Sequence, residues 1–301
     1  MMKKLSIVFV LLAGSLWGFM GVFVRRLNEY GFDAMDIVAL RAMVTLVLMT
    51  FFLVIYDRKL FKIKLKDIWC FLGTGILSIV FFNFCYFKAI TLTTLPVAAV
   101  LLYTAPAIVT ILSSFLFKER ITKIKIGALL FTFVGCMLTL GLVGSNIKIG
   151  LMGMLFGLGA GFGYALYSIF SRYAINRSYH SFTISLYTFM FATIATTPFS
   201  NMGMIKVYVL SGIGNVLFLL VFGMVSTVLP YIFYNFGLKG LDNSKASIIA
   251  SVEPVVASVV GIVLYNEKIW FMQVVGVVMI LSSIAMCNIN IDKLSRNKGK
   301  N

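Results

Sequence analysis

One carboxylate falls inside a long apolar run of the sequence, where an ionised group is costly. Glu253 lies midway along the apolar stretch 246–265 and directly precedes Pro254. Because a carboxylate is expensive to place in lipid surroundings, its presence there predicts a functional site. Glu253 could bind a substrate ammonium group or carry a coupling proton. Alternatively, it could be a structural carboxylate that bonds backbone groups freed beside the proline.

A single basic residue also lies within an apolar run. Arg41 is near the start of the stretch 37–56. It could bind a substrate carboxylate. The interpretation preferred from the sequence is a pair with Asp36, or a cap on helix ends, with the long side chain extending outward to the membrane surface. One glutamate and one arginine in apolar surroundings would suit a zwitterionic solute.

Tyrosine, tryptophan and asparagine side chains recur in the apolar runs and could line a central cavity. They offer hydrogen bonds without net charge, which suits neutral or zwitterionic solutes. Each of them could instead serve in helix packing or in an aromatic belt at the membrane surface. The candidate cavity residues are Trp17, Asn83, Tyr86, Tyr103, Tyr164, Tyr167, Tyr234, Asn235 and Glu253.

The elements that position these side chains must lie in a lipid bilayer. Hydrophobic residues make up 60% of the 301 residues and charged residues only 12%, against roughly 45–50% and 25% in soluble globular domains. A chain of this size cannot bury so much apolar surface in a water-soluble core. The composition therefore excludes a soluble enzyme, a disordered chain and a disulfide scaffold.

Ten apolar stretches have about the 20 residues that a helix needs to cross a bilayer. Helices are expected because lipid offers no hydrogen-bond partner to an open backbone. The predicted fold class is therefore an all-α integral membrane protein with ten transmembrane helices. The stretches are 5–24, 37–56, 68–87, 96–117, 124–143, 151–170, 182–199, 216–238, 246–265 and 270–287.

The basic residues predict the orientation of these spans. With the N-terminus placed inside the cell, 19 Lys and Arg residues fall in inside segments and 6 in outside segments. Positive residues favour the cytoplasmic side, so both termini are predicted to be cytoplasmic. The net charge of +16 is then a topology signal, and no nucleic-acid partner is expected.

The chain contains an internal repeat of one five-helix unit. A shift of 148 residues aligns 72–121 with the second half without a gap, and a shift of 147 aligns the first and sixth spans. Because five is odd, the second unit must be inverted relative to the first, which is typical of transporters with a substrate site near the midplane. Matched pairs include Pro106 with Pro254, Glu119 with Glu267, Trp17 with Tyr164, and Arg25 with Arg172.

The two matched prolines predict two bends at equivalent places. Pro106 and Pro254 each lack an amide donor and clash with the preceding turn, so both helices should kink. Such a bend could open the cavity and expose backbone carbonyls to it. It could equally be a fixed kink that only serves packing.

The sequence resembles the drug/metabolite transporter superfamily, in particular its ten-span members with two EamA-type repeats. The resemblance covers nearly the whole chain, and Asn266-Glu267 departs from the Gly-Glu often found there, which should affect only the local turn. It implies a carrier of small metabolites, often an exporter of amino acids or toxic compounds. The residues that carry it are Leu16-Trp17-Gly18, Arg41, Pro106, Lys118-Glu119-Arg120, Ala246 to Ser251, Glu253-Pro254-Val255-Val256-Ala257, Glu267 and Gly276.

Together these observations predict a secondary transporter of the cell membrane that exports amino acids or related compounds by alternating access. The two repeats are expected at 1–145 and 146–290, followed by a polar cytoplasmic tail at 291–301. The alternatives are a passive channel, a lipid-flipping protein of the same architecture, or an importer. An enzyme is not expected, because the spans contain no nucleophile–base set. The expected partners are a small solute and membrane lipids, with no cofactor and no metal, while the coupling ion and oligomeric state stay open.

Overall fold

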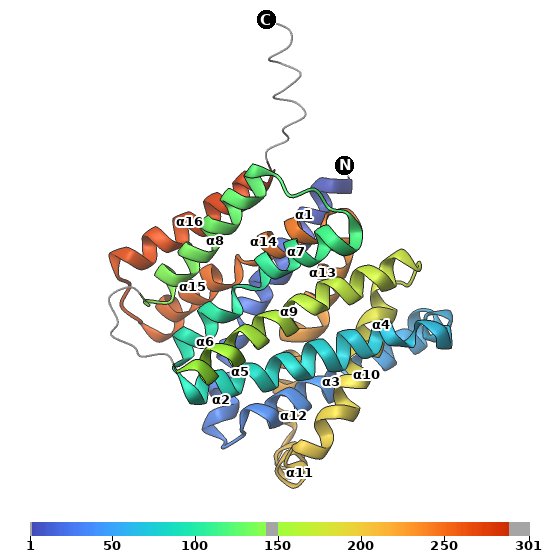
Figure 1. Cartoon of the computed structure of the whole chain (residues 1–301). Helices are drawn as coiled ribbons and strands as arrows, with labels where there is room; N and C mark the ends of the chain where they lie inside the picture. Colours follow the sequence, from blue (N-terminus) through green and yellow to red (C-terminus); the bar gives the residue numbers. More distant parts are fainter. Residues whose placement is uncertain (1, 143–149, 289–301) are drawn as a thin grey trace, which may run out of the picture.

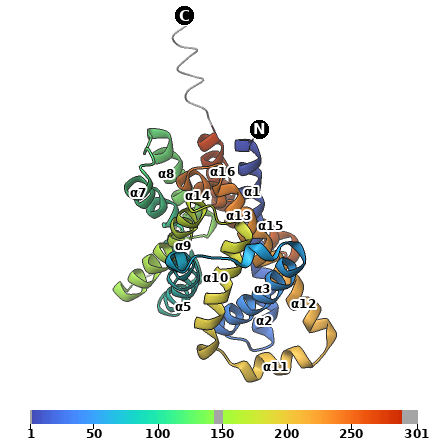
Figure 2. The same ribbon diagram turned by 90° about the vertical axis from the view of Figure 1, so that its right-hand side faces the viewer.

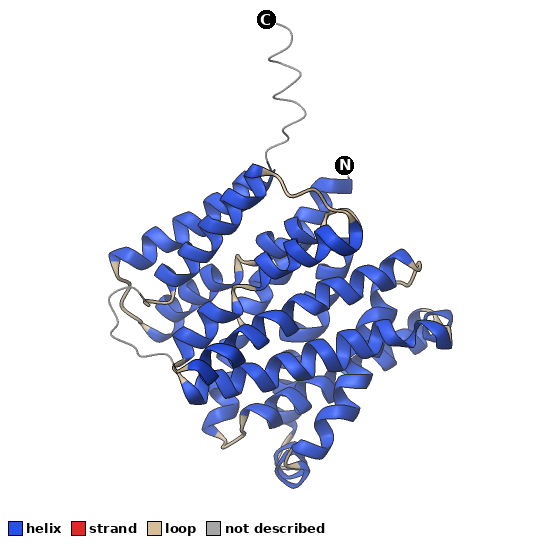
Figure 3. Ribbon diagram, in the orientation of Figure 1, coloured by secondary structure: helices blue, strands red, loops and turns tan. Residues whose placement is uncertain are grey.

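The structure is a computed structural model that describes residues 2–142 and 150–288, and every regular element among them is helical (Figures 1 and 3). The predicted all-α class is therefore confirmed. The predicted repeat boundary at 145/146 and the predicted tail at 291–301 lie outside the described residues.

The helices of the two halves follow one another in a similar order. The first half contains α1 (Met2–Gly18), α2 (Met20–Glu29), α3 (Ala34–Tyr56), the short η1 (Arg58–Phe61) and η2 (Leu65–Asp67), α4 (Ile68–Leu72), the π-helical η3 (Gly73–Val80), α5 (Phe81–Leu92), α6 (Leu95–Leu102), α7 (Ala105–Phe117) and α8 (Lys123–Thr139). The second half contains α9 (Leu151–Asn176), α10 (Ser181–Thr196), η4 (Thr197–Phe199), α11 (Met202–Leu210), α12 (Ile213–Gly223), the π-helical η5 (Met224–Val228), α13 (Leu229–Leu238), α14 (Asn243–Ala250), α15 (Glu253–Tyr265) and α16 (Phe271–Asn288).

Eight helical segments are long and apolar enough to cross a membrane, and they correspond to eight of the ten predicted stretches. The other two stretches form α8 and α16, which pack against each other (Figure 1). α8 has 17 residues, and the apolar part of α16, Phe271–Cys287, has the same length. At 1.5 Å per residue this is a few ångströms short of a ~30 Å hydrocarbon core. The count of ten spans therefore stays a prediction.

Two spans are interrupted immediately before their matched prolines. The helix breaks at Tyr103 and Thr104, and Pro106 is the second residue of α7. A corresponding break at Ser251 and Val252 precedes α15, whose second residue is Pro254. Proline fits the first turn of a helix, where its missing amide hydrogen costs nothing. At each predicted bend the regular helix is thus interrupted by two turn residues within one span.

The two π-helical segments also fall at repeat-related places. A shift of 148 residues places η5 within the stretch that matches η3. Each half therefore has a π-helical segment at the corresponding place of the corresponding helix. Short π segments often accompany functional sites in helices. Neither segment was predicted from the sequence.

The core lies where helices from both halves meet. α1 packs against α13, α14 and α15, while α9 packs against α5, α6 and α7. Figures 1 and 2 show the start of α1 and the end of α16 at the same end of the bundle, and α11 running across the opposite end. Each half therefore sends one helix into the other, and the buried centre contains residues of both.

Candidate functional site

A cluster of five aromatic rings occupies the contact between α1, α9 and α13. The Trp17 ring lies 5.2 Å from Tyr231, 5.5 Å from Tyr234 and 6.3 Å from Tyr164 between ring centroids. Tyr167 lies 4.9 Å from Tyr231. These distances suit edge-to-face and tilted aromatic packing. Four of the predicted cavity residues are thus brought together from opposite halves of the chain.

The hydroxyl groups of this cluster have polar partners on neighbouring helices. The Tyr234 hydroxyl lies 2.6 Å from the hydroxyl of Ser168, and the Asn235 amide donates to the Tyr167 hydroxyl at 2.8 Å. The amide oxygen of Asn235 has no partner although the residue is fully buried. A buried polar atom without a partner is costly, so this oxygen is available to a donor that enters the site.

Glu253 is the first residue of α15 and stands directly at the helix break. Its side chain interacts with the Tyr164 hydroxyl and with the charge of Arg41. Glu253 also interacts electrostatically with Tyr86 and Tyr103. Glu253, Tyr86, Tyr103 and Tyr164 all lie deep in the bundle yet remain partly accessible. The predicted carboxylate and three predicted tyrosines therefore share one region beside the break.

A small cavity lies at the two helix breaks, where α6 and α7 face α14 and α9. Its volume is about 10 Å³, roughly the space that one water molecule requires. Solute sites usually need about 300–1,000 Å³, so this cavity is too small for a solute in this conformation. The lining residues are Leu102, Tyr103, Ala105, Pro106, Tyr164, Ser247, Ala250 and Ser251.

Arg41 corrects the preferred sequence interpretation. The residue is only 5% exposed, so it does not extend outward. Its guanidinium donates to the Met20 sulfur at 2.9 Å and interacts electrostatically with Tyr231 and Glu253. The proposed pair with Asp36 is wrong, because the Asp36 carboxylate accepts backbone hydrogen bonds at 2.6 Å from Asn201 and 3.3 Å from Asp33. In α3, Asp36 completes the capping of the first turn, and its side chain is committed there.

The sequence prediction and the structure differ at two residues of this region. Asn83 is buried, but its amide donates to the Ile79 carbonyl of the same helix at 2.7 Å, so it serves its own helix here. Tyr231, which was not predicted, contacts Trp17 and Tyr167 and packs on Phe189. The signal that could have found it is helical spacing, since Tyr231 precedes Tyr234 by three residues and shares its face.

One end of the bundle contains a largely buried polar network, here called the Glu119 network, in which the Asp242 side chain is about half exposed. Its members come from the end of α7, from α8, from α9 and from the start of α14. The Glu119 carboxylate accepts from the backbone amides of Asn243 at 2.7 Å and Ser244 at 3.2 Å, and from the Ser244 hydroxyl. Exposed amides at a helix start favour a negative partner. The members are Glu119, Lys125, Arg172, Asp242, Asn243 and Ser244.

Two cations complete the Glu119 network. The ammonium of Lys125 lies 3.7 Å from Glu119 and 3.4 Å from Asp242. Arg172 donates to the Asn243 side chain at 2.7 Å and also to the carbonyl of Leu241. The network thus binds the end of the first half to the start of α14, four helices in all.

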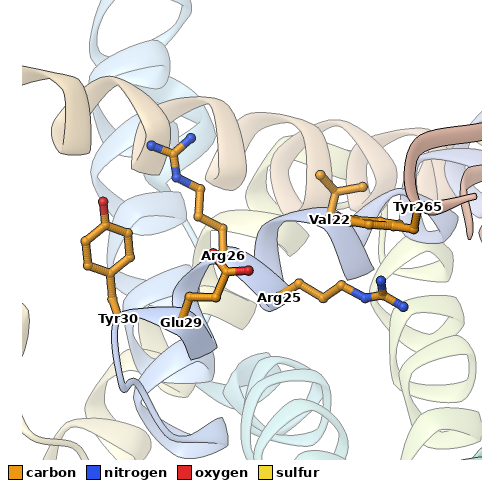
Figure 4. A pocket seen from close by; sticks show the side chains of 6 residues that line it. All are labelled: Val22, Arg25, Arg26, Glu29, Tyr30 and Tyr265. Atoms are coloured by element: carbon orange, nitrogen blue, oxygen red, sulfur yellow. The ribbon is translucent and has the colours of Figure 1, made fainter.

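The repeat-related carboxylate, Glu267, has very different surroundings. It pairs with Arg25 at 2.6 Å, with the two side chains about half exposed at 52% and 51%. Arg25 also stacks over the Tyr265 ring at 4.0 Å. Arg25 also lines an open cavity of about 500 Å³, shown in Figure 4. The lining residues are Val22, Arg25, Arg26, Glu29, Tyr30 and Tyr265.

The two carboxylates nevertheless follow the same local backbone. The residues before them, Lys118 and Asn266, both adopt left-handed conformations with φ of 57° and 53°. The amide of Glu119 donates to Ser113, and that of Glu267 donates to Gly261, both at 3.2 Å. This is the usual way to end a helix. Asparagine tolerates the left-handed region, which explains why Asn266 can replace the expected glycine.

Metal binding finds no support in the described part of the chain. Within residues 2–142 and 150–288, no group of three or more His, Cys, Asp or Glu side chains is placed to hold a metal ion.

Comparisons with known proteins place the chain among transporters. The EamA-like transporter family matches residues 4–141 and again 151–289. A protein of Archaeoglobus fulgidus named as an uncharacterized transporter is 29% identical over 280 residues, which is 91% of this chain and 93% of its own. YxxF of Bacillus subtilis, also named as an uncharacterized transporter, is 25% identical over 99% of this chain and 92% of its own.

A solved crystal structure shows the same fold. It matches 94% of this chain and 96% of its own length with a TM-score of 0.76 and 15% identity. The sequence resemblance to the drug/metabolite transporter superfamily is thereby confirmed by the family match. The chain belongs to the EamA-like transporter family, carries two of its repeats and is a multi-pass membrane protein.

Proposed function

We propose that this protein is a secondary transporter that moves small organic solutes, amino acids or related compounds among them, by alternating access. The observation that carries this proposal is the difference between repeat-related ends. Glu119 lies in a buried network that crosses four helices, whereas Glu267 forms an exposed pair beside an open cavity of about 500 Å³. Two similar halves in unlike conformations are what alternating access requires.

The proposed topology has ten spans in two inverted five-helix units, with the halves at 1–145 and 146–290. The start of α1 and the end of α16 lie at the same end of the bundle, which supports an even number of membrane crossings (Figure 1). The mutual packing of α8 and α16 supports counting both as spans. The excess of Lys and Arg at the Glu119 end supports a cytoplasmic location for it and for both termini in the cell membrane. We call it the inner end and the Glu267 end the outer end.

The proposed substrate site lies between these ends, at the helix breaks. Trp17 and the tyrosines of α9 and α13 supply aromatic walls, and Glu253 supplies a charge beside them. The proposed conformation is closed at the inner end and at the centre. Export is the proposed direction, in keeping with the family, and an importer is the alternative outcome of the transport assay.

Side-specific labelling tests the inverted topology. Arg120 and Lys268 are both exposed, are related by the 148-residue shift and flank the two carboxylates. Single cysteines at these positions, in a background without the four buried native cysteines, should react with an impermeant reagent from opposite sides of the membrane. Reaction of both from one side would end the proposal.

Flux in proteoliposomes tests the mechanism. A carrier gives saturable uptake and counterflow of a labelled solute from a metabolite panel. Linear flux without counterflow supports the passive channel, and movement of a fluorescent phospholipid between leaflets supports the lipid-flipping protein. Accumulation of the same solute outside cells that overproduce the chain supports export, and accumulation inside supports import.

A further inference from the structure

Arg41 is a buried cation whose hydrogen-bonding capacity is largely unused. It is 5% exposed, and within the described residues its guanidinium donates one hydrogen bond, to the Met20 sulfur, which is a weak acceptor. Its second terminal nitrogen, Nη2, is buried without any partner. We propose that the Arg41 guanidinium is the subsite that binds the carboxylate of the transported solute, an inference that rests on the transport function proposed above.

No acidic side chain in residues 2–142 and 150–288 forms an ion pair with Arg41. Asp36, five residues earlier on the same helix, is committed to backbone amides. Glu253 influences Arg41 electrostatically, but the two do not form an ion pair. A guanidinium stays charged under all physiological conditions and is costly to bury without an anion. The site therefore lacks one anionic partner.

The geometry of the donor indicates the chemical class of that partner. A guanidinium presents parallel N–H groups that match the two oxygens of a carboxylate. Tyr231 interacts electrostatically with Arg41, and its ring belongs to the aromatic cluster with Trp17. A solute that carries a carboxylate and an apolar group would place the first on Arg41 and the second against these rings. An ammonium on the same solute would face Glu253.

Arg172 provides the internal comparison, because it is another largely enclosed arginine with partners. It donates to the side chain of Asn243 and to the carbonyl of Leu241. Its role is therefore structural, within the Glu119 network. Arg41 has the desolvation cost of a buried charge without such compensation, which is the pattern of a binding residue that stabilises the protein only when its ligand is present.

The first test needs no ligand and compares two arginines. Arg41→Gln should raise the midpoint of thermal unfolding of the purified, ligand-free protein, because it removes an uncompensated buried charge. Arg172→Gln should lower the midpoint, because it leaves Asn243 and Leu241 unpaired. A fall for Arg41→Gln comparable to that for Arg172→Gln would assign Arg41 a structural role and overturn the subsite.

The second test uses three matched probes on the detergent-purified protein: L-leucine, 4-methylpentanoate, which lacks the amine, and 3-methylbutylamine, which lacks the carboxylate. Both carboxylates should stabilise the wild type against thermal unfolding, and the amine should not. Arg41→Gln should weaken this binding about tenfold or more, and Arg41→Lys should retain part of it. No protection by either carboxylate, or equal protection by the amine, overturns the subsite.

Leucine counterflow separates this inference from the transport function. Carboxylate binding that depends on Arg41, without counterflow of leucine, supports the subsite and rejects the transporter. Counterflow of 3-methylbutylamine equal to that of leucine supports the transporter and overturns the subsite.

Discussion

Glu119 and Glu267 occupy matching positions in the two repeats and follow the same left-handed helix ending, yet their partners differ. Glu119 binds the first amides of α14 and lies close to a buried lysine. Glu267 pairs with Arg25, which lines an open cavity. Identical local structure has therefore been used for a closed contact at one end and an exposed one at the other.

Part of the difference between the partners of Glu119 and Glu267 follows from the types of the residues opposite each carboxylate. Asn243 and Ser244 begin α14 and leave their amides for Glu119, whereas α6 begins with Leu95 and Pro96, and Pro96 has no amide hydrogen. The first turn of α6 is capped by its own Thr94, which accepts from the Val97 amide at 3.4 Å. The start of α6 thus needs no carboxylate from the other half. The two ends are unequal in composition as well as in conformation.

Lys125 and Gln273 add a second inequality. They are related by the 148-residue shift, but Lys125 lies between two carboxylates, while Gln273 donates to the Thr139 carbonyl at 3.3 Å. A buried charge close to two acids holds a contact more strongly than a neutral amide does. The comparison therefore predicts that substitutions at the inner end cost more stability than matched ones at the outer end.

Removal of the two carboxylates should give the largest contrast. Glu119→Ala breaks a largely buried charge network: the start of α14 loses its anion, and Lys125 keeps only the half-exposed Asp242 as a partner. This should cost about 3–5 kcal/mol. Glu267→Ala removes an exposed pair and should cost less than ~1 kcal/mol. Denaturant unfolding in detergent measures both. Equal losses in the two variants would contradict the comparison.

Substitution in the centre should affect transport and spare the fold. Glu253→Gln keeps the shape of the side chain but removes its charge, so the protein should purify with unchanged stability. Loss of a charged contact of about 1.5–3 kcal/mol corresponds to a roughly tenfold to hundredfold drop in transport. Counterflow in proteoliposomes is the measurement, and Glu267→Gln is the control, expected to retain transport. Wild-type rates in Glu253→Gln would assign that carboxylate a structural role.

Exchange of one residue between the halves sharpens the comparison further. Lys125→Gln gives the inner end the residue of the outer end and leaves two acids without their cation. It should cost about 1–2 kcal/mol, because glutamine can replace only a neutral hydrogen bond. The converse variant, Gln273→Lys, gains no buried acid and should not stabilise the fold. Thermal unfolding of the two variants decides this, and a gain for Gln273→Lys would reverse the argument.

The smallest effect is a pH dependence confined to the inner end. His180 precedes α10, and its pKa is lowered by burial and by the nearby charge of Lys239. The folded state then favours the neutral ring, so the unfolded chain takes up the proton first as the pH falls. The contribution of His180 is present at neutral pH and is lost as the pH drops below its usual pKa of about 6.5.

Replacement of this histidine isolates its contribution. His180→Gln should flatten the fall in the unfolding midpoint between about pH 7 and pH 5, relative to the wild type. An unchanged pH profile in His180→Gln would show that other groups cause the dependence.

Residue type within the apolar runs and repeat matching pointed to several residues that the structure brings together. Trp17 and Tyr164 were paired by the repeat, and they do contact each other, with Tyr167 and Tyr234 beside them. Tyr231 was missed because its helical spacing, three residues before Tyr234 on the same face, was not used. The partner of Arg41 was assigned to Asp36 on proximity in sequence, but Asp36 caps its own helix and binds the Asn201 amide.

The sequence by itself determined the membrane as solvent, the helical class, the two repeats and the breaks before Pro106 and Pro254. These follow from composition, from the length of apolar runs and from the missing amide of proline, all of which act locally. Only the tertiary structure decided that Glu119 closes one end, that Glu267 stays exposed and that Arg41 lacks an anion. Partners of buried charges are chosen by packing between helices distant in sequence, and no local pattern encodes that choice.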